Sequence, residues 1–144
     1  MNKIYLLLVE DNEGDIILTK EALENSSLIK TMDIVRDGKA AIDMFQNILQ
    51  SNTLALPDMV LLDINLPKLN GQQVLQFIKE HPELKHIPVI MFTTSSSEKD
   101  IVQSYRNYAN CFVSKPVEVD HFMDVVSKIE NFWFSTVQVV SKNK

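Results

Sequence analysis

Five polar residues with the chemistry of a phosphoryl-transfer site each stand at the end of a short apolar segment. They are Glu10, Asp11, Asp63, Thr93 and Lys115. Clustered carboxylates repel one another unless a cation neutralises them. Mg²⁺ prefers one or two carboxylates together with waters and phosphate oxygens. The set therefore contains a carboxylate nucleophile, ligands for a metal ion, and a hydroxyl and an ammonium that could contact a phosphoryl group.

These residues lie far apart in the chain, so only a particular fold can bring them together. Nearly continuous apolar runs predict strands that are covered on both faces, as in a parallel sheet. The runs are Ile4–Val9, Met32–Val35 (the weakest), Met59–Leu62, Val89–Phe92 and Cys111–Val113. Each is followed by a stretch with apolar residues three and four apart, which predicts a helix. These stretches are Asp15–Asn25, Lys39–Gln50, Gly71–Glu80, Glu98–Asn107 and Glu118–Trp133.

The alternation predicts an α/β domain of the (βα)5 type, with five parallel strands in a doubly wound, flavodoxin-like sheet. In such sheets, ligands bind beyond the carboxyl ends of the strands. The polar residues singled out above follow those ends, so they are predicted to meet at one edge. We expect the domain to span residues 1–134. The tail 135–144 contains Val137, Val139 and Val140 and is open to three interpretations: an extra edge strand, a dimer arm or a frayed end.

Composition limits the class of protein. The chain has 144 residues, 45% of them apolar and 23% charged, which is typical of one globular domain. Its net charge of −5 argues against a general nucleic-acid binder. Cys111 is the only cysteine, so an intrachain disulfide is impossible, and we expect it to be a small buried hydrophobe. The first apolar run is too short for a secretory signal or a membrane helix, and a cytoplasmic location is expected.

Four motifs give the chain a family resemblance. They are LLVEDN (7–12), LLDINLPKLNG (61–71), VIMFTTS (89–95) and FVSKP (112–116). In this order and spacing they resemble the receiver domain of two-component response regulators, from Leu6 to about Ile129. The resemblance implies a Mg²⁺-dependent transfer of a phosphoryl group from a histidine kinase to Asp63. It implies a signalling protein rather than an enzyme, one that assists its own phosphorylation and dephosphorylation.

The resemblance also assigns the metal ligands and the phosphate contacts. Asp11 and Asp63 would bind Mg²⁺ directly, Glu10 would bind it through a water, and Asn65 would offer its backbone carbonyl. Many receivers have Asp where this chain has Glu10, but the longer side chain still reaches through water. Lys115 would contact the phosphoryl group.

Three further expectations concern the response to phosphorylation. Thr93 would be the switch hydroxyl and Phe112 the switch aromatic, although many receivers have Tyr at the latter position. A cis peptide bond between Lys115 and Pro116 would shape the loop that carries the lysine. Because no effector domain is expected, the output would be a contact with an unknown downstream protein. Phe112 as plain core and Thr94 as an ordinary strand end stay open alternatives.

A narrower likeness concerns the C-terminal part of the chain. The stretches 93–117 and IENFWFSTV (129–137) are similar to the stand-alone regulators of phytochrome histidine kinases. In that group the last helix contributes to a homodimer, which would make Phe132 and Trp133 interface residues. The alternative is that both rings cap the core.

Two rival functions are worth separating from the receiver hypothesis. A small aspartyl-phosphate phosphatase also uses an Asp at a strand end with Mg²⁺, but such enzymes carry a D-x-D pair on the first strand and usually a cap insertion. Here the corresponding segment begins at Asp63 on the third strand. A pseudo-receiver that only binds partners is the second rival, and it would lack the phosphorylation residues that this chain has.

Overall fold

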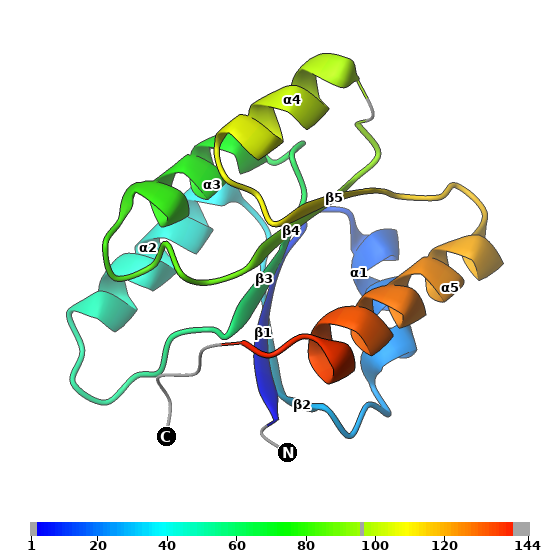
Figure 1. Ribbon diagram of the computed structural model, residues 1–144, viewed down its shortest axis with the longest axis horizontal. Helices are drawn as coiled ribbons and strands as arrows, with labels where there is room; N and C mark the ends of the chain where they lie inside the picture. The colour runs from blue at the N-terminus through cyan, green and yellow to red at the C-terminus, as the bar shows by residue number, and fades with distance from the viewer. Residues whose placement is uncertain (1–2, 96, 140–144) are drawn as a thin grey trace.

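The computed structural model describes residues 3–95 and 97–139, and it alternates strands with helices as predicted (Figure 1). The strands are β1 (Ile4–Val9), β2 (Ile29–Val35), β3 (Met59–Leu62), β4 (Val89–Thr93) and β5 (Cys111–Ser114). The helices are α1 (Glu13–Leu23), α2 (Gly38–Leu49), α3 (Gly71–Glu80), α4 (Glu98–Arg106) and α5 (Val119–Ile129), followed by the π-helix η1 (Glu130–Thr136). Among the described residues, no helix is both long enough and apolar enough to cross a bilayer.

All five strands are parallel and form one sheet in the order β2-β1-β3-β4-β5. Figure 1 shows α1 and α5 on one face of this sheet and α2, α3 and α4 on the other. The predicted (βα)5 fold is therefore confirmed. The order reverses direction at β1 and β3, so the connections leave a crevice beyond the carboxyl ends of these strands, where doubly wound sheets bind ligands.

The core lies in two layers, one on each side of the sheet. Along β1, for example, Leu7 points into the layer under α2 and α3, while Leu6 points into the layer under α1 and α5. Strands β3 and β4 are buried at every position. Burial on both faces is why these strands are continuous apolar runs without polar alternation.

Two element boundaries differ from those expected by three residues or more, and the others that differ do so by one or two. Strand β2 begins at Ile29, three residues before the expected start, because Lys30, Thr31 and Asp33 interrupt its apolar pattern at an edge of the sheet. The last helix is α-helical only to Ile129 and continues as a π-helix to Thr136. Ile129 and Phe134 are both buried in the same layer and are five residues apart, which is the spacing of the hydrogen bonds in a π-helix.

The C-terminal segment is described as far as Val139. Beyond η1, Val139 packs against the layer under α1 and α5, and residues 137–139 are not a strand. The interpretation as an extra edge strand therefore does not apply to these residues. Val140 and the rest of the tail lie outside the described residues.

Candidate functional site

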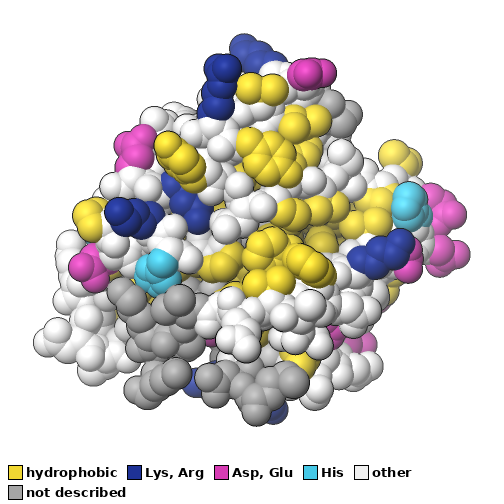
Figure 2. Space-filling model, viewed as in Figure 1, with side chains coloured by type: hydrophobic (Ala, Val, Ile, Leu, Met, Phe, Trp, Pro, Cys, Tyr) yellow, Lys and Arg dark blue, Asp and Glu magenta, His cyan; other side chains and the backbone are white. Residues whose placement is uncertain are grey.

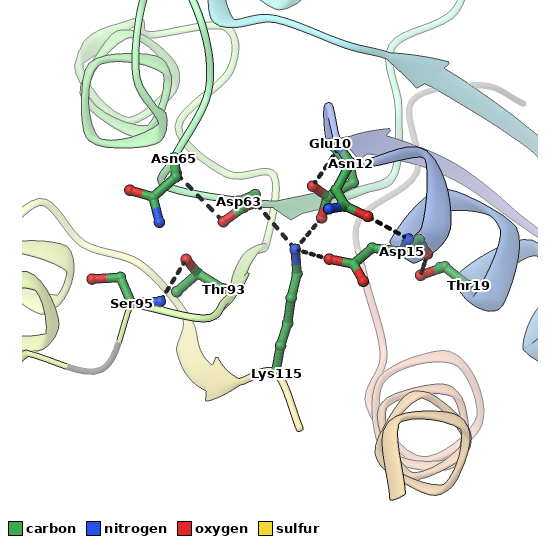
Figure 3. A network of polar contacts seen from close by, with 9 residues as sticks. All are labelled: Glu10, Asn12, Asp15, Thr19, Asp63, Asn65, Thr93, Ser95 and Lys115. Carbon is green, nitrogen blue, oxygen red and sulfur yellow. Dashed lines mark hydrogen bonds and ion pairs between the residues drawn. The ribbon is translucent and has the colours of Figure 1, made fainter. Parts of the chain in front are cut away.

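The carboxyl ends of β1, β3, β4 and β5 place the predicted chemical groups at one edge of the sheet (Figure 3). Glu10 and Asp11 follow β1, Asp63 follows β3, Thr93 ends β4, and Lys115 follows β5. The side chains of Glu10, Asp63, Thr93 and Lys115 are buried, whereas Asp11 is exposed. This arrangement gives a site with buried reactive groups and one solvent-facing carboxylate.

Lys115 occupies the centre of the site. Its Nζ donates to Asp63 Oδ2 at 3.0 Å, to Asp15 Oδ2 at 2.8 Å, and to Glu10 Oε1. Burial by itself would lower the pKa of Lys115, but the hydrogen bonds to Asp15 and Glu10 and the negative charge of Asp63 outweigh it and raise the pKa above its usual value. The ammonium therefore stays charged and holds the ends of β1, β3 and β5 and the start of α1 together.

The peptide bond between Lys115 and Pro116 is trans, so the predicted cis bond is wrong for this structure. No peptide bond in the described residues is cis. The backbone N–H of Lys115 donates to the carbonyl of Thr93 at 2.8 Å, which extends the ladder between β4 and β5. The trans isomer is also the one that X–Pro bonds favour, by about 0.5–1 kcal/mol.

Three carboxylates form a cluster that could hold a metal ion. Glu10, Asp11 and Asp63 each offer one oxygen, and these oxygens lie within 4.8 Å of one another. Burial raises the pKa of Glu10 to about 7, although the hydrogen bond from Lys115 acts in the opposite direction. Carboxylate oxygens at this spacing suit a hard divalent cation, which would also relieve the repulsion between them.

Asn65 lies beside this cluster, in the loop after β3. Its side chain is exposed, and its backbone N–H donates to Asp63 Oδ1 at 3.4 Å. This contact helps to fix the orientation of the Asp63 carboxylate. The role of the Asn65 carbonyl as a metal ligand stays a prediction.

The loop after β3 is held close to Asp63 by the start of α3. A Cβ atom built on Gly71 would lie 2.0 Å from the carbonyl oxygen of Asp63, and the N–H of Gly71 donates to Ile64 O at 2.8 Å. Asn70 caps α3 in a capping box with Gln73. Glycine is required at position 71 because the helix backbone packs directly on the end of β3.

The segment from β4 to α4 carries the predicted switch hydroxyl. Thr93 Oγ1 accepts the backbone N–H of Ser95 at 3.3 Å, and the Ser95 hydroxyl donates to the carboxylate of Asp100 on α4. The side-chain amide of Gln72 on α3 donates to Asp100 O at 3.2 Å and to Ser104 Oγ at 2.9 Å. A continuous series of polar contacts thus joins Thr93 to α4 and α4 to α3.

Phe112, the predicted switch aromatic, is half-buried and packs against the layer under α2 and α3. Its backbone N–H donates to the hydroxyl of Tyr105 on α4 at 3.1 Å. Strand β5 is at the edge of the sheet, so this hydroxyl binds an N–H group that no further strand could satisfy. A switching movement of Phe112 stays a prediction.

The two aromatic residues predicted at an interface have different environments. Phe132 is 54% exposed, whereas Trp133 is half-buried and packs with Cys111 against the layer under α1 and α5. The rings meet edge to face with centroids 5.6 Å apart. Figure 2 shows apolar side chains gathered in the middle of this side of the molecule, the side on which α4, β5 and the C-terminal helices lie in Figure 1.

Asp15 belongs to the site but was not predicted from the sequence. It lies in the first turn of α1, where Asn12 caps the helix by accepting the N–H of Asp15 at 2.9 Å. The sequence did contain a signal for Asp15, because a helix that follows β1 directly must place its first turn beside the strand ends. Acidic residues are common in first turns for helix stability alone, so this position did not stand out.

Comparison with known proteins agrees with this geometry. Residues 6–127 match the response regulator receiver domain. Response regulator Rcp1 of Synechocystis sp. (strain ATCC 27184 / PCC 6803 / Kazusa) is 40% identical over 132 residues, which covers 92% of this chain and 90% of Rcp1.

Two solved structures share the fold over nearly their whole length. The phosphorylated cyanobacterial phytochrome response regulator RcpA matches with a TM-score of 0.91 and 40% identity, covering 96% of this chain and 99% of that chain. The Mn(2+)-bound form of response regulator Rcp1 matches with a TM-score of 0.90 and 38% identity, with the same coverage.

Receiver-domain response regulators are signalling proteins that interact with histidine kinases and are phosphorylated on an aspartate. Receiver domains bind a divalent metal at an acidic pocket, and the oxygens of Glu10, Asp11 and Asp63 fit such an ion. With a family match over residues 6–127 and a relative at 40% identity, the chain belongs to the response regulator receiver family.

Proposed function

We propose that Asp63 is the phosphoacceptor of this response regulator and that a histidine kinase is the donor. The observation that carries the proposal is the position of the Asp63 carboxylate, between Lys115 Nζ at 3.0 Å and the oxygens of Glu10 and Asp11. The ammonium and a metal ion at this position could both contact the Asp63 nucleophile, and both could neutralise the oxygens of the incoming phosphoryl group.

In the proposed reaction, a carboxylate oxygen of Asp63 forms a bond to phosphorus while the bond from phosphorus to the imidazole nitrogen of a phosphohistidine breaks. The electron pair of that bond stays on the imidazole. Lys115 neutralises one phosphoryl oxygen, and the hydroxyl of Thr93 donates a hydrogen bond to another. Mg²⁺ held by Glu10, Asp11, Asp63 and the carbonyl of Asn65 would supply charge neutralisation.

The signal would then pass to the surface of α4, β5 and α5. To reach a phosphoryl oxygen, Thr93 would draw in the segment that contains Ser95, and the contact from Ser95 to Asp100 would transmit the movement to α4. Phe112 is tied to α4 through Tyr105, so its ring would follow. An unknown downstream protein would read the altered surface.

Labelling with acetyl phosphate tests the acceptor. In the presence of Mg²⁺, the protein should shift on a phosphate-affinity gel, and D63N should abolish the shift. D124N is the matched control, because Asp124 is an exposed carboxylate on α5 that pairs only with Lys128 among the contacts described. A shift that survives D63N would refute the assignment, as would multiple turnover of small phosphoesters, which would indicate an enzyme.

A phytochrome-type histidine kinase is the donor that we propose. Support comes from the likeness to RcpA, which is a phytochrome response regulator, over 96% of this chain. Phosphotransfer should be profiled at short times against the purified histidine kinases of the same genome. Preferential transfer from a kinase without a phytochrome photosensor would refute this choice of donor, and leave Asp63 as acceptor unaffected.

We also propose a homodimer that uses the C-terminal helices. Phe132 supports it, since a large ring that is 54% exposed on η1 is typical of an interface residue. Sedimentation should show a dimer that F132D dissociates. L54D is the matched control, because Leu54 is similarly exposed at 59% but lies between α2 and β3. A wild-type monomer at high concentration, with and without a phosphoryl mimic, would refute the dimer.

A further inference from the structure

Among the residues that the structure describes, Asp15 is the one carboxylate bound to Lys115 that is not part of the acidic cluster. The ammonium of Lys115 has three hydrogens, and its three acceptors are Glu10, Asp15 and Asp63 (Figure 3). Two of these acceptors, Glu10 and Asp63, also offer oxygens to the candidate metal site, whereas Asp15 does not. Asp15 is therefore the partner of Lys115 that a cation in the cluster would leave unoccupied.

The orientation of Asp15 is not explained by a need to stabilise the start of α1. Asn12 already caps this helix, and Glu13 places a negative charge in the same first turn. The backbone carbonyl of Asp15 accepts the hydroxyl of Thr19, and the backbone N–H is bound by Asn12. The carboxylate takes part in neither contact, and its Oδ2 binds Lys115 Nζ at 2.8 Å. The Asp15 side chain is 23% exposed.

The candidate metal site and the ammonium draw on the same two carboxylates, Glu10 and Asp63. A proton-bearing nitrogen at hydrogen-bonding distance from Glu10 and Asp63 opposes a cation at those carboxylates, both by repulsion and by using their lone pairs. A third carboxylate bound to the ammonium weakens this opposition, because it neutralises the charge and gives the ammonium another acceptor. Asp15, in the first turn of α1, is such a carboxylate.

We propose that Asp15 is a positioning residue that holds Lys115 between the metal ligands and the phosphoryl group. It raises the affinity of the cluster for a divalent cation, and it limits the attraction between Lys115 and the phosphoryl group. The inference deepens the proposed function, since it assumes that Asp63 receives the phosphoryl group. It predicts opposite effects of one substitution on cation binding and on phosphoryl binding.

The cation half of the proposal is tested with Mg²⁺ alone, by calorimetric titration at pH 8. D15N should weaken Mg²⁺ binding about fivefold, the size expected for one charged hydrogen bond at a partly exposed site. E21Q removes the same charge from an exposed position of α1 and should change the affinity by less than about twofold. Circular dichroism at the same temperature checks that each variant is folded.

A double-mutant cycle shows whether the effect acts through Lys115. In the K115M background, D15N should change Mg²⁺ affinity by less than about twofold, because no ammonium is left to position. An equal loss in both backgrounds would overturn the proposal and assign the effect to the charge of Asp15 alone. An unchanged affinity of D15N in the wild-type background would overturn it too.

The phosphoryl half uses beryllofluoride as the mimic, at saturating Mg²⁺ for every variant. D15N should bind beryllofluoride about threefold more tightly than the wild type, since Lys115 then has one competing carboxylate fewer. Weaker binding by D15N would overturn the proposal. Failure of the proposed function would give a different result. D63N would then keep its acetyl-phosphate labelling, while the Mg²⁺ titrations would still decide the role of Asp15.

Discussion

At the scale of single residues, the site is defined by an excess of negative charge around one buried ammonium. Lys115 faces Glu10, Asp15 and Asp63, and Asp11 adds a fourth carboxylate nearby. Removing several ions from water is costly, and a buried ion pair is weak evidence of stability. The arrangement is better understood as a site that binds a metal cation together with a phosphoryl anion. In the metal-free protein, the clustered carboxylates lower the stability of the fold.

The raised pKa of Glu10 leads to a pH-dependent metal affinity. Because its pKa is about 7, Glu10 is mainly protonated below this pH, and a proton must leave before the carboxylate can serve a metal. Mg²⁺ affinity should therefore be constant above about pH 8 and fall towards tenfold per pH unit below pH 7. Calorimetry in two buffers with different ionisation enthalpies should detect the release of about one proton at pH 6.

E10Q is the control for this pH dependence, since glutamine has no proton to release in this range. Its Mg²⁺ affinity should be weaker at pH 8 but nearly constant from pH 6 to pH 8. A slope in E10Q equal to that of the wild type would show that another group titrates.

At the scale of elements, the junction between β3 and α3 sets the position of Asp63. Gly71 lets the backbone of α3 contact the end of β3. Gly38, at the start of α2, lets the loop between β3 and α3 pass close by, because a Cβ atom on Gly38 would lie 1.8 Å from Leu69 O. Both contacts are with backbone atoms, which cannot move aside as a side chain would. The loop that carries Asn65 is thereby held between two helix starts.

Substitution at this junction should disturb the fold and the site together. G71A should lower the free energy of unfolding by about 2–3 kcal/mol, as overpacking against a fixed backbone does, and should slow acetyl-phosphate labelling because Asp63 moves. Urea unfolding and the labelling rate measure the two effects. G14A is the control: its nearest contact is Asn12 Oδ1 at 3.3 Å, and stability should change by less than about 1 kcal/mol.

At the scale of the whole molecule, binding of a metal ion at one edge of the sheet should stabilise the entire domain. The ligands follow β1 and β3, which are adjacent in the middle of the sheet, so unfolding separates them. A ligand that binds only the folded state adds RT ln(1 + [L]/Kd) to the free energy of unfolding.

Mg²⁺ at ten times its dissociation constant should therefore add about 1.4 kcal/mol, and a chelator should reverse the gain. Thermal unfolding with and without EDTA measures this effect, with an expected change in Tm of about 2–6 °C. D11N should abolish most of the Mg²⁺ effect, and the fold should tolerate it because Asp11 is exposed. An equal rise in Tm for D11N would locate the stabilising ion elsewhere.

Much of the fold and the site could be predicted from sequence because the relevant patterns are local. Burial on both faces makes β3 and β4 continuous apolar runs, and a polar residue directly after such a run must lie at the carboxyl end of its strand. That Glu10, Asp63 and Lys115 lie at one edge of the sheet then follows from its parallel strands. Among the strands, β2 had the least accurate boundary, since an edge strand has a weaker pattern.

Other features depend on contacts between distant segments, which sequence patterns do not encode. The amino-acid sequence by itself determined the order of the elements and the chemical groups at the strand ends. Only the tertiary structure decided that Asp15 binds Lys115, that the bond to Pro116 is trans, and that Trp133 packs inwards while Phe132 faces outwards. The physical reason is that a strand end fixes where a residue lies, whereas the partner of its side chain is chosen by charge and packing across the whole domain.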